Sequence, residues 1–332
     1  MKFLLFLVKL GITVIVLYFA LRNVSLNEYK HAFSLLTPKV FLFLVSTVIL
    51  QVFILAFRWC YLLILTAKAK MALTEAAVGI LISFFFSQGL PASIGGDAFR
   101  VWWTKKRGVD SSSAIKIVFF DRIYGLLALT IACISSILYF FLLKREASAQ
   151  ILSLAVAIIL AGVFLWLLVM PVRLGISRFL MNATAHSTSW LRGLVQWGVQ
   201  ARDSLSSRKI SESSLLIGSS LLTHCMVILQ AYVIGSLLCP EQISILICIL
   251  AVPPALFVSY MPFSIAGWGV REASMVMAFG LFGINAATAV IISLTIGMAV
   301  LATSLIGGIF WIMGYRKSHQ QDLVYLNTEK AV

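Results

Sequence analysis

Long apolar runs separated by short polar stretches make up most of this chain. About 20 consecutive apolar residues form a helix long enough to span a bilayer, and the pattern therefore predicts an all-α polytopic membrane protein. Pro and Gly interrupt two of the runs, those at 75–94 and 243–265, so these two need not cross. The eight apolar segments lie at 3–21, 40–65, 75–94, 114–143, 151–170, 214–238, 243–265 and 284–313.

The positions of Lys and Arg indicate which segments cross. If the first two segments cross from a cytoplasmic N-terminus, a crossing third segment would put the basic stretch at 100–107 outside, against the positive-inside rule. A re-entrant hairpin that turns near 91–96 removes this conflict, and the same reasoning makes 243–265 re-entrant from the opposite side. We predict about six crossing helices plus two re-entrant helical hairpins, with both termini cytoplasmic. Eight full crossings also place both ends inside and stay open as an alternative.

The two interrupted segments share a motif. Residues 91–100 read P-x-S-I-G-G-x-x-x-R and residues 262–271 read P-x-S-I-A-G-x-x-x-R. Because the charge pattern has them entering from opposite sides, we predict an inverted repeat, and paired breaks of this kind indicate a transporter site near the midplane. The alternative is that Gly and Pro only permit tight helix crossings. The predicted layout is one transmembrane domain at 1–317, with half-repeats 3–143 and 151–313 around a cytoplasmic interfacial linker at 171–213, and a cytoplasmic tail at 318–332.

Composition excludes a water-soluble protein and restricts the partners. Of the 332 residues, 61% are hydrophobic and 11% charged, against about 25% charged in soluble domains. The net charge of +14 fits basic cytoplasmic loops, so no nucleic acid partner is expected. The five cysteines show no C-x-x-C spacing, which predicts free thiols and neither a metal nor a cofactor. The run at 3–21 has no small-x-small site behind it, which favours an uncleaved first helix over a signal peptide.

Charged residues inside the apolar segments are the candidate site. Ionisable groups in a span normally face a partner or a cavity. Neighbours on a helix point about 100 degrees apart, so we expect these groups to pair across elements in a polar cluster that joins the repeats. The Arg fork donates the bidentate hydrogen bonds that a lipid phosphate accepts. The candidate substrate-binding residues are Arg100, Arg271, Asp97, Asp121, Arg122, Glu272, Ser93, Ser264, Gly96, Gly267 and Arg58.

Three alternatives to a site role remain at this stage. The charged groups can be structural salt bridges alone, and snorkelling toward the membrane surface would explain Arg58 without a function. His224 and Gln230 are expected to form hydrogen bonds between helices rather than to carry protons. The linker stripe around Trp190 and Trp197 predicts an interfacial helix, with a partner-binding helix as the alternative.

Three ordered motifs resemble a known family. They read L-P-A-S-I-G-G-D-A-F-R at 90–100, F-D-R-I-Y-G-L at 120–126 and P-F-S-I-A-G-W-G-V-R-E-A at 262–273. The chain resembles the flippase-like transmembrane region of bacterial lysylphosphatidylglycerol synthases, with Asp121 at a position that is usually Glu. The resemblance implies an integral protein of the bacterial inner membrane that moves a polar-headed lipid between leaflets. The chain ends at Val332 without the soluble synthase domain of fused members, so the resemblance does not extend to lipid synthesis.

The leading hypothesis is a lipid flippase or scramblase in which Arg100 and Arg271 hold a phosphate headgroup in a hydrated cavity. An intramembrane transferase acting on lipid-linked substrates, with Asp97 or Asp121 as acid or base, is the enzymatic alternative. An accessory subunit of an envelope-lipid complex is the third hypothesis. The expected partners are membrane lipids with a phosphate-bearing headgroup and a lipid-synthesis enzyme, whereas the lipid species and the oligomeric state do not follow from the sequence.

Overall fold

The computed structural model describes residues 34, 37–89, 94–143, 189–206, 208–260, 268–313 and 324–325, and most of these residues are helical. Two short strands, β1 (Ala69–Lys70) and β2 (Val324–Tyr325), form one antiparallel pair. The helices are α3 (Pro38–Ala67), α4 (Leu73–Gly89), α5 (Ile94–Lys105), α6 (Ser111–Leu143), α9 (Ser189–Ser206), α10 (Ile210–Leu238), α11 (Ile245–Ser259), α12 (Val270–Gly280) and α13 (Ala286–Ile312).

Four of the described helices are long and apolar enough to cross a membrane. They are α3, α6, α10 and α13, each with more than the 20 or so residues that a crossing needs. This confirms an all-α, multi-pass membrane protein. The predicted crossings at 3–21 and 151–170 lie outside the described residues.

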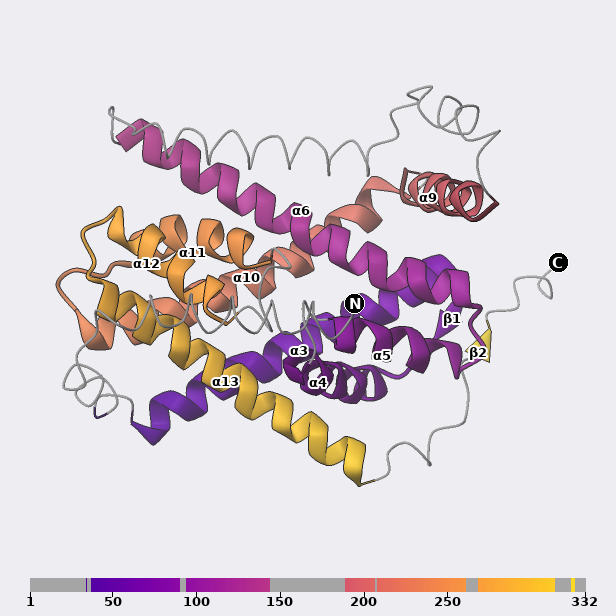
Figure 1. Cartoon of the computed structure of the whole chain (residues 1–332), viewed down its shortest axis with the longest axis horizontal. Helices are drawn as coiled ribbons and strands as arrows, with labels where there is room; N and C mark the ends of the chain where they lie inside the picture. The colour runs from indigo at the N-terminus through magenta and orange to yellow at the C-terminus, as the bar shows by residue number, and fades with distance from the viewer. Residues whose placement is uncertain are drawn as a thin grey trace.

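At each interrupted segment the structure has a short helix that is followed by a second short helix. The first contains α4, and α5 begins at its end; the second contains α11 and is followed by α12. Residues 90–93 and 261–267 lie outside the described residues. The lengths of α4, α5, α11 and α12, namely 17, 12, 15 and 11 residues, are below a full crossing. In Figure 1, α4 and α5 lie in the right half of the molecule, and α11 and α12 lie in the left half.

Helix α11 continues through Pro253 and Pro254 instead of breaking there. Pro253 has no backbone N–H, so the carbonyl of Ile249, four residues earlier, loses its helical donor. The Ser136 hydroxyl of α6 donates to that carbonyl oxygen at 2.8 Å. A neighbouring serine therefore satisfies the freed backbone group, as hydrocarbon surroundings require.

The helices α3 to α6 and the helices α10 to α13 make matching sets of contacts. Helix α4 packs on α13 as α11 packs on α6, and α3 packs on α13 as α10 packs on α6. The contacts within each half also correspond. In the first half, α3 and α5 each pack on α4 and α6. In the second half, α10 and α12 each pack on α11 and α13. The set of packed pairs is unchanged when α3, α4, α5 and α6 are exchanged with α10, α11, α12 and α13.

Helices α3 and α10 pack directly against each other and run antiparallel. Three hydrogen bonds show how the two helices are aligned. Gln230 and Ser220 of α10 bond Thr47 and Arg58 of α3 at 2.7 and 2.5 Å, and Arg208, just before α10, bonds Thr66 of α3 at 2.9 Å. As residue numbers rise along α3, they fall along the facing chain. In Figure 1, α6 begins on the right and α13 begins on the left, so these two also run in opposite senses.

Within the predicted linker at 171–213, residues Ser189–Ser206 form α9, which confirms the helix predicted around Trp190 and Trp197. The Trp197 ring packs edge-on against Phe119 of α6, with ring centroids 5.5 Å apart. Ala201 and Leu205 are buried in the core shared with α3 to α6. Part of the apolar face of α9 thus packs against the protein. The location of α9 in the headgroup layer stays a prediction.

Candidate functional site

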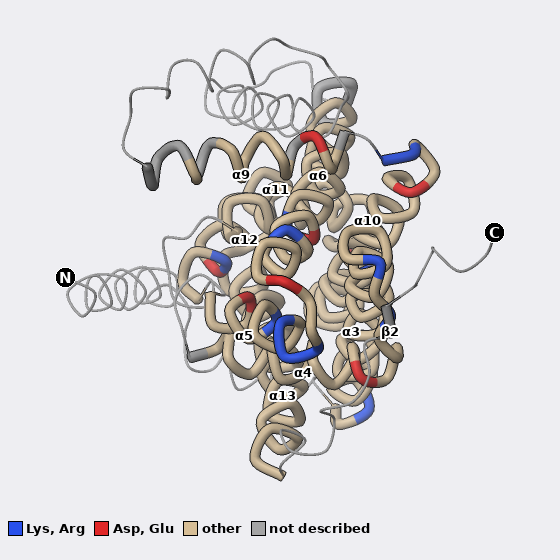
Figure 2. The backbone as a smooth tube through the Cα atoms, turned by 90° about the vertical axis from the view of Figure 1, so that its right-hand side faces the viewer, with Lys and Arg blue, Asp and Glu red and all other residues tan. Residues whose placement is uncertain are grey.

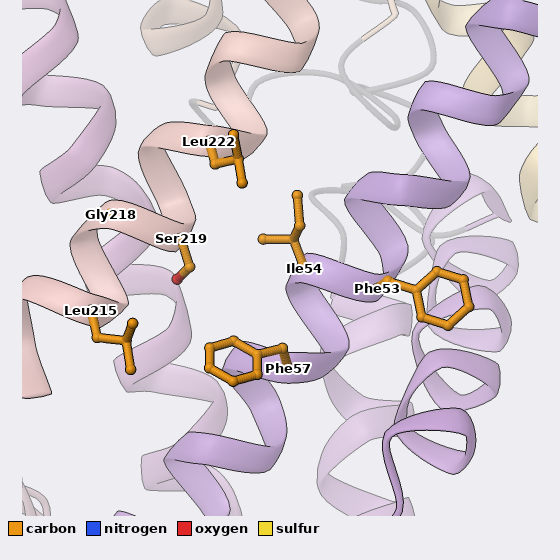
Figure 3. A pocket seen from close by; sticks show the side chains of 7 residues that line it. All are labelled: Phe53, Ile54, Phe57, Leu215, Gly218, Ser219 and Leu222. Atoms are coloured by element: carbon orange, nitrogen blue, oxygen red, sulfur yellow. The ribbon is translucent and has the colours of Figure 1, made fainter.

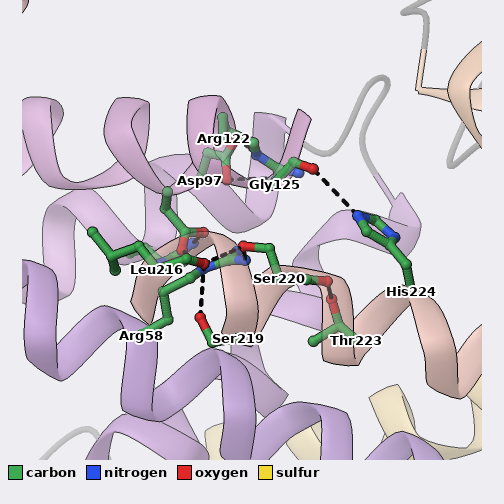
Figure 4. Close-up of polar contacts among 11 residues, drawn as sticks. Arg58, Asp97, Arg122, Gly125, Leu216, Ser219, Ser220, Thr223 and His224 are labelled. Carbon is green, nitrogen blue, oxygen red and sulfur yellow. Dashed lines mark hydrogen bonds and ion pairs between the residues drawn. The ribbon is translucent and has the colours of Figure 1, made fainter. Parts of the chain in front are cut away.

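Two arginines and one aspartate form a buried triad between α3, α5 and α6. Arg58 Nε donates to Asp121 Oδ1 at 2.5 Å, and Arg100 Nη1 donates to Asp121 Oδ2 at 2.7 Å. The three residues are only 5%, 4% and 4% exposed. On its other side, Arg58 Nη1 donates to the Ser220 hydroxyl of α10, and Figure 4 shows Arg58 reaching from α3 toward that helix.

Close helix packing brings the triad together. Gly96 lets α5 lie against α4, because a Cβ there would stand 2.2 Å from the Ser87 hydroxyl and 2.5 Å from the Ser83 carbonyl oxygen. The guanidinium of Arg100 stacks over the Trp59 ring, 4.8 Å from its centroid. Arg100 therefore has an aromatic face on one side and a carboxylate at one corner.

The triad carries an excess of positive charge and unused donors. Within the described part of the chain, Asp121 is the one carboxylate paired with Arg58 or Arg100, so two cations face one anion. Arg100 Nε and Nη2 and Trp59 Nε1 are buried and donate to no described residue. Because burying an unpaired charge and unsatisfied donors is costly, this arrangement favours binding of an anion.

The neighbouring motif charges pair across elements rather than with their sequence neighbours. Arg122 of α6 donates two hydrogen bonds to Asp97 of α5, from Nη2 at 2.7 Å and from Nε at 3.0 Å. The two side chains are 40% and 27% exposed, so this pair is far more open than the triad. The prediction that Asp121 and Arg122 find partners on other elements is confirmed.

A second charged cluster lies on α12 and α13. Arg271 pairs with Glu272 at 2.9 Å, and its Nε donates to the Ser293 hydroxyl at 3.0 Å. Ser293 in turn donates to the same Glu272 oxygen at 2.8 Å. The backbone N–H of Gly269 donates to the other oxygen of Glu272 at 2.6 Å. Within the described residues this cluster is electrically neutral.

Room for Arg271 is made by a glycine on α13. A Cβ at Gly297 would stand 2.3 Å from Arg271 Nη2 and 2.8 Å from the Trp268 ring. Arg271 stacks over Trp268 at 4.8 Å, as Arg100 stacks over Trp59. The expectation that residues 271 and 272 pair with other elements holds only for their bonds to Ser293. They also pair with each other, because in the first turn of α12 the Glu272 side chain folds back to cap Gly269 and meets the Arg271 guanidinium there.

The structure thus separates the predicted site residues into groups. Arg58, Arg100 and Asp121 form the triad, with Gly96 in its supporting helix contact. Asp97 with Arg122 and Arg271 with Glu272 form the other two pairs, and no contact joins Arg100 to Arg271 among the described residues. Ser93, Ser264 and Gly267 lie outside the described residues.

Arg58 does not snorkel. It is 5% exposed and bonded to residues of two other helices, so the snorkelling explanation is wrong. His224 and Gln230 do form hydrogen bonds between helices, His224 with the Gly125 carbonyl oxygen at 3.2 Å and Gln230 with Thr47. All five cysteines are free thiols, as predicted.

Sequence reasoning missed Trp59, Ser220 and Ser293. One available signal was spacing: Arg100 meets its partner on the next helix 21 positions later, and Arg271 meets Ser293 22 positions later. The repeat therefore extends beyond its Pro-to-Arg motif and marks Ser293 as the counterpart of Asp121.

Comparison with known families now identifies the chain. A family model described as the lysylphosphatidylglycerol synthase transmembrane region matches residues 6–308. The chain belongs to this family. No curated protein and no solved structure gives a significant match.

The match to the lysylphosphatidylglycerol synthase transmembrane region contains every residue of the triad and of the two charged pairs. Membership connects the chain to a function in membrane lipid biology. In this member of the family, two buried arginines share one carboxylate where α3, α5 and α6 meet.

Proposed function

We propose that the protein is a lipid flippase or scramblase that moves a phosphate-bearing lipid between the leaflets of the bacterial inner membrane. The observation that carries this proposal is the triad, with one cation in excess and two guanidinium nitrogens, Arg100 Nε and Nη2, without a described acceptor. Moving a charged headgroup through hydrocarbon is costly, and a buried cation that replaces its solvation lowers that cost.

The chemistry of the triad suits phosphate. A guanidinium presents a planar fork of N–H donors that matches two oxygens of one phosphate. On Arg100, Nε and Nη2 form such a fork on the side of the guanidinium away from Asp121. A phosphate there would also compensate the excess charge of the triad.

An inverted repeat with two re-entrant hairpins is the architecture that we propose for this transport. Its support is the antiparallel register of α3 and α10, the opposite senses of α6 and α13, and the packing that survives exchange of the halves. With the apolar segments at 3–21 and 151–170 as further crossings, this gives six crossings in all. Inverted-topology repeats with broken helices are the arrangement of many alternating-access transporters.

Charge placement supports cytoplasmic termini and orients the molecule. Figure 2 views the end at which α3 finishes and at which α6 and α10 begin, and Lys and Arg occur on its connecting segments. The opposite end, with the start of α3 and the α10–α11 turn, carries Lys39 and Glu241. The positive-inside rule then puts the basic end in the cytoplasm. The basic residues of that end include Lys68, Lys70, Lys105, Lys106, Arg107 and Lys209.

The intramembrane transferase with Asp97 or Asp121 as acid or base has less support. Arg122 donates to both carboxylate oxygens of Asp97. Asp121 is held in the same way. Both of its carboxylate oxygens accept guanidinium N–H donors. A carboxylate held by a guanidinium at each oxygen is poorly placed to take up or release a proton, so the geometry favours charge balancing over proton transfer.

Reconstitution tests the proposal. The full chain in vesicles with fluorescent phosphatidylglycerol should expose inner-leaflet headgroups to an added quencher faster than protein-free vesicles do. Arg100→Lys should slow this about tenfold, since it keeps the charge but loses the bidentate fork. Lys105→Arg, at the exposed end of α5, is the matched control and should keep the full rate. Headgroup accessibility unchanged by the protein across several lipid classes would contradict the proposal.

A further inference from the structure

An open apolar groove of about 400 Å³ runs between α3 and α10 on the outer surface of the helix bundle. Figure 3 shows Ile54 and Phe57 of α3 on one side of it and Leu215, Ser219 and Leu222 of α10 on the other, whereas Phe53 points away from it. Ser219 is the one polar side chain among the lining residues, and its hydroxyl already donates to the Leu216 carbonyl of its own helix. The lining residues are Phe53, Ile54, Phe57, Leu215, Gly218, Ser219 and Leu222.

The groove and the Arg58–Ser220 hydrogen bond both lie where α3 packs against α10. Phe57 precedes Arg58 on α3, and Ser219 precedes Ser220 on α10. Both partners of the Arg58–Ser220 hydrogen bond are thus next in sequence to groove residues, and Arg58 links that bond to Asp121 and the excess positive charge. Because Ser220 also donates to the Leu216 carbonyl at 2.8 Å, its hydroxyl keeps a partner when Arg58 leaves it.

The surroundings of the groove indicate its occupant. Its apolar side chains are about half exposed, with Phe57 at 42% and Leu222 at 46%. In a bilayer an apolar groove has no hydrophobic advantage over the neighbouring lipid, so the groove alone cannot select a ligand. The buried excess cation can, because it attracts lipids whose headgroup carries negative charge.

We infer that this groove seats one acyl chain of a phosphate-bearing lipid while the phosphate replaces Ser220 Oγ as the acceptor for Arg58 Nη1. The seam between α3 and α10 is then the route by which the headgroup reaches the triad. The inference rests on the proposed function and names the access path for the same site. On the orientation proposed above, Arg58 lies toward the cytoplasmic end of α3, so this path opens from the cytoplasmic half.

Site-specific photocrosslinking in the full chain tests the occupant. A benzoylphenylalanine is placed at Leu222 in the groove and, as a matched control, at Leu305, a 54% exposed position on α13. The bilayer contains equal parts of phosphatidylglycerol and digalactosyl-diacylglycerol with the same acyl chains, and mass spectrometry gives the ratio of captured lipids.

The ratio of phosphatidylglycerol to the neutral lipid should be about tenfold higher at Leu222 than at Leu305, as one charge-assisted hydrogen bond allows. Arg58→Gln should lower the ratio at Leu222 to that at Leu305. Equal ratios at the two positions in the unaltered chain would overturn the inference.

A second variant closes the groove without disturbing the helices. A Cβ at Gly218 meets no atom within 4 Å, so a side chain can start there without a clash, and Gly218→Phe should fill the space between α3 and α10. It should lower headgroup movement about tenfold, whereas Leu305→Phe should not change it. Full activity of Gly218→Phe would count against the access path.

The two proposals fail separately. Phosphatidylglycerol enrichment at Leu222 without any headgroup movement would refute the flippase and leave the lipid site in place. Headgroup movement with equal ratios at Leu222 and Leu305 would refute the lipid site and leave the flippase.

Discussion

The two charged clusters occupy corresponding places in the two halves but differ in charge. Arg58 and Gln230 are 172 positions apart, as are Asp121 and Ser293, and Arg100 and Arg271 are 171 apart. The first half thus has two arginines and a carboxylate where the second has one arginine, an amide and a hydroxyl. In the second half the carboxylate is Glu272, next to its arginine on α12.

Because of this difference, the hydrogen-bonding and charge requirements are met within the second-half cluster but not within the first-half cluster. Glu272 accepts hydrogen bonds from Arg271, Ser293 and the Gly269 backbone, and the cluster is neutral. In the first half, Asp121 must serve two guanidiniums, and Arg100 keeps two buried donors without a described acceptor. One scaffold therefore supports a structural ion pair in one half and a candidate anion site in the other.

Removing the central carboxylate of the triad should have the largest effect. Asp121→Asn leaves two buried guanidiniums without a counter-charge and should cost about 3 to 5 kcal/mol in the free energy of unfolding. Thermal unfolding in detergent measures the loss. Ser293→Ala, at the corresponding position, should cost only about 1 kcal/mol. Equal losses in the two variants would show that the halves do not differ as described.

Placing a carboxylate at Ser293, the position in the second half that corresponds to Asp121, should have the next largest effect. Ser293→Asp adds a second buried acid beside one arginine and should cost about 3 kcal/mol. Ser293→Asp combined with Glu272→Gln restores neutrality and should recover the stability to within about 1 kcal/mol of the unaltered chain. A double-mutant cycle measures the coupling, and additive losses would contradict interchangeable carboxylate positions.

Making the first half neutral should change transport more than stability. Arg58→Gln leaves Asp121 paired with Arg100, so the unfolding free energy should shift by no more than about 1 kcal/mol, while headgroup movement should fall about tenfold. Gln230→Met is the matched control on the facing helix: it loses the bond to Thr47 but should keep the transport rate. Unimpaired transport by Arg58→Gln would remove the excess cation from the mechanism.

The smallest expected difference lies at the starts of α6 and α13. Asp110 Oδ1 accepts from the Ser113 N–H, and the hydrogen bonds from Ser113 hold the pKa of Asp110 below its usual value. At the corresponding start of α13, Asn285 caps Thr288 and does not titrate.

A lowered folded-state pKa stabilises the protein above the unfolded-state pKa, and this stability is lost as the pH falls through the folded value. Because Asp110 is exposed, the effect should be a fraction of about 1 kcal/mol. Unfolding temperatures at falling pH should drop slightly more for the unaltered chain than for Asp110→Asn. Identical pH profiles would show that this cap contributes nothing.

Much of the fold could be predicted from the sequence. Apolar runs and their interruptions predict the long helices and the two short-helix pairs, because hydrocarbon surroundings leave few ways to satisfy the backbone. The sequence did not predict that α11 continues through Pro253 and Pro254, since that depends on Ser136 from a helix distant in the chain. The sequence indicated which charged residues form the candidate site but not which of them pair with one another.

The amino-acid sequence by itself determined the helical membrane fold, the family and the set of charged residues, because hydropathy, motif spacing and residue chemistry are local properties of the chain. Only the tertiary structure decided that Asp121 joins Arg58 to Arg100, that Asp97 joins Arg122, and that Arg271 turns to its own neighbour. The physical reason is that a buried charge takes whichever partner the packed helices bring within hydrogen-bonding distance, and helix packing joins residues far apart in the sequence.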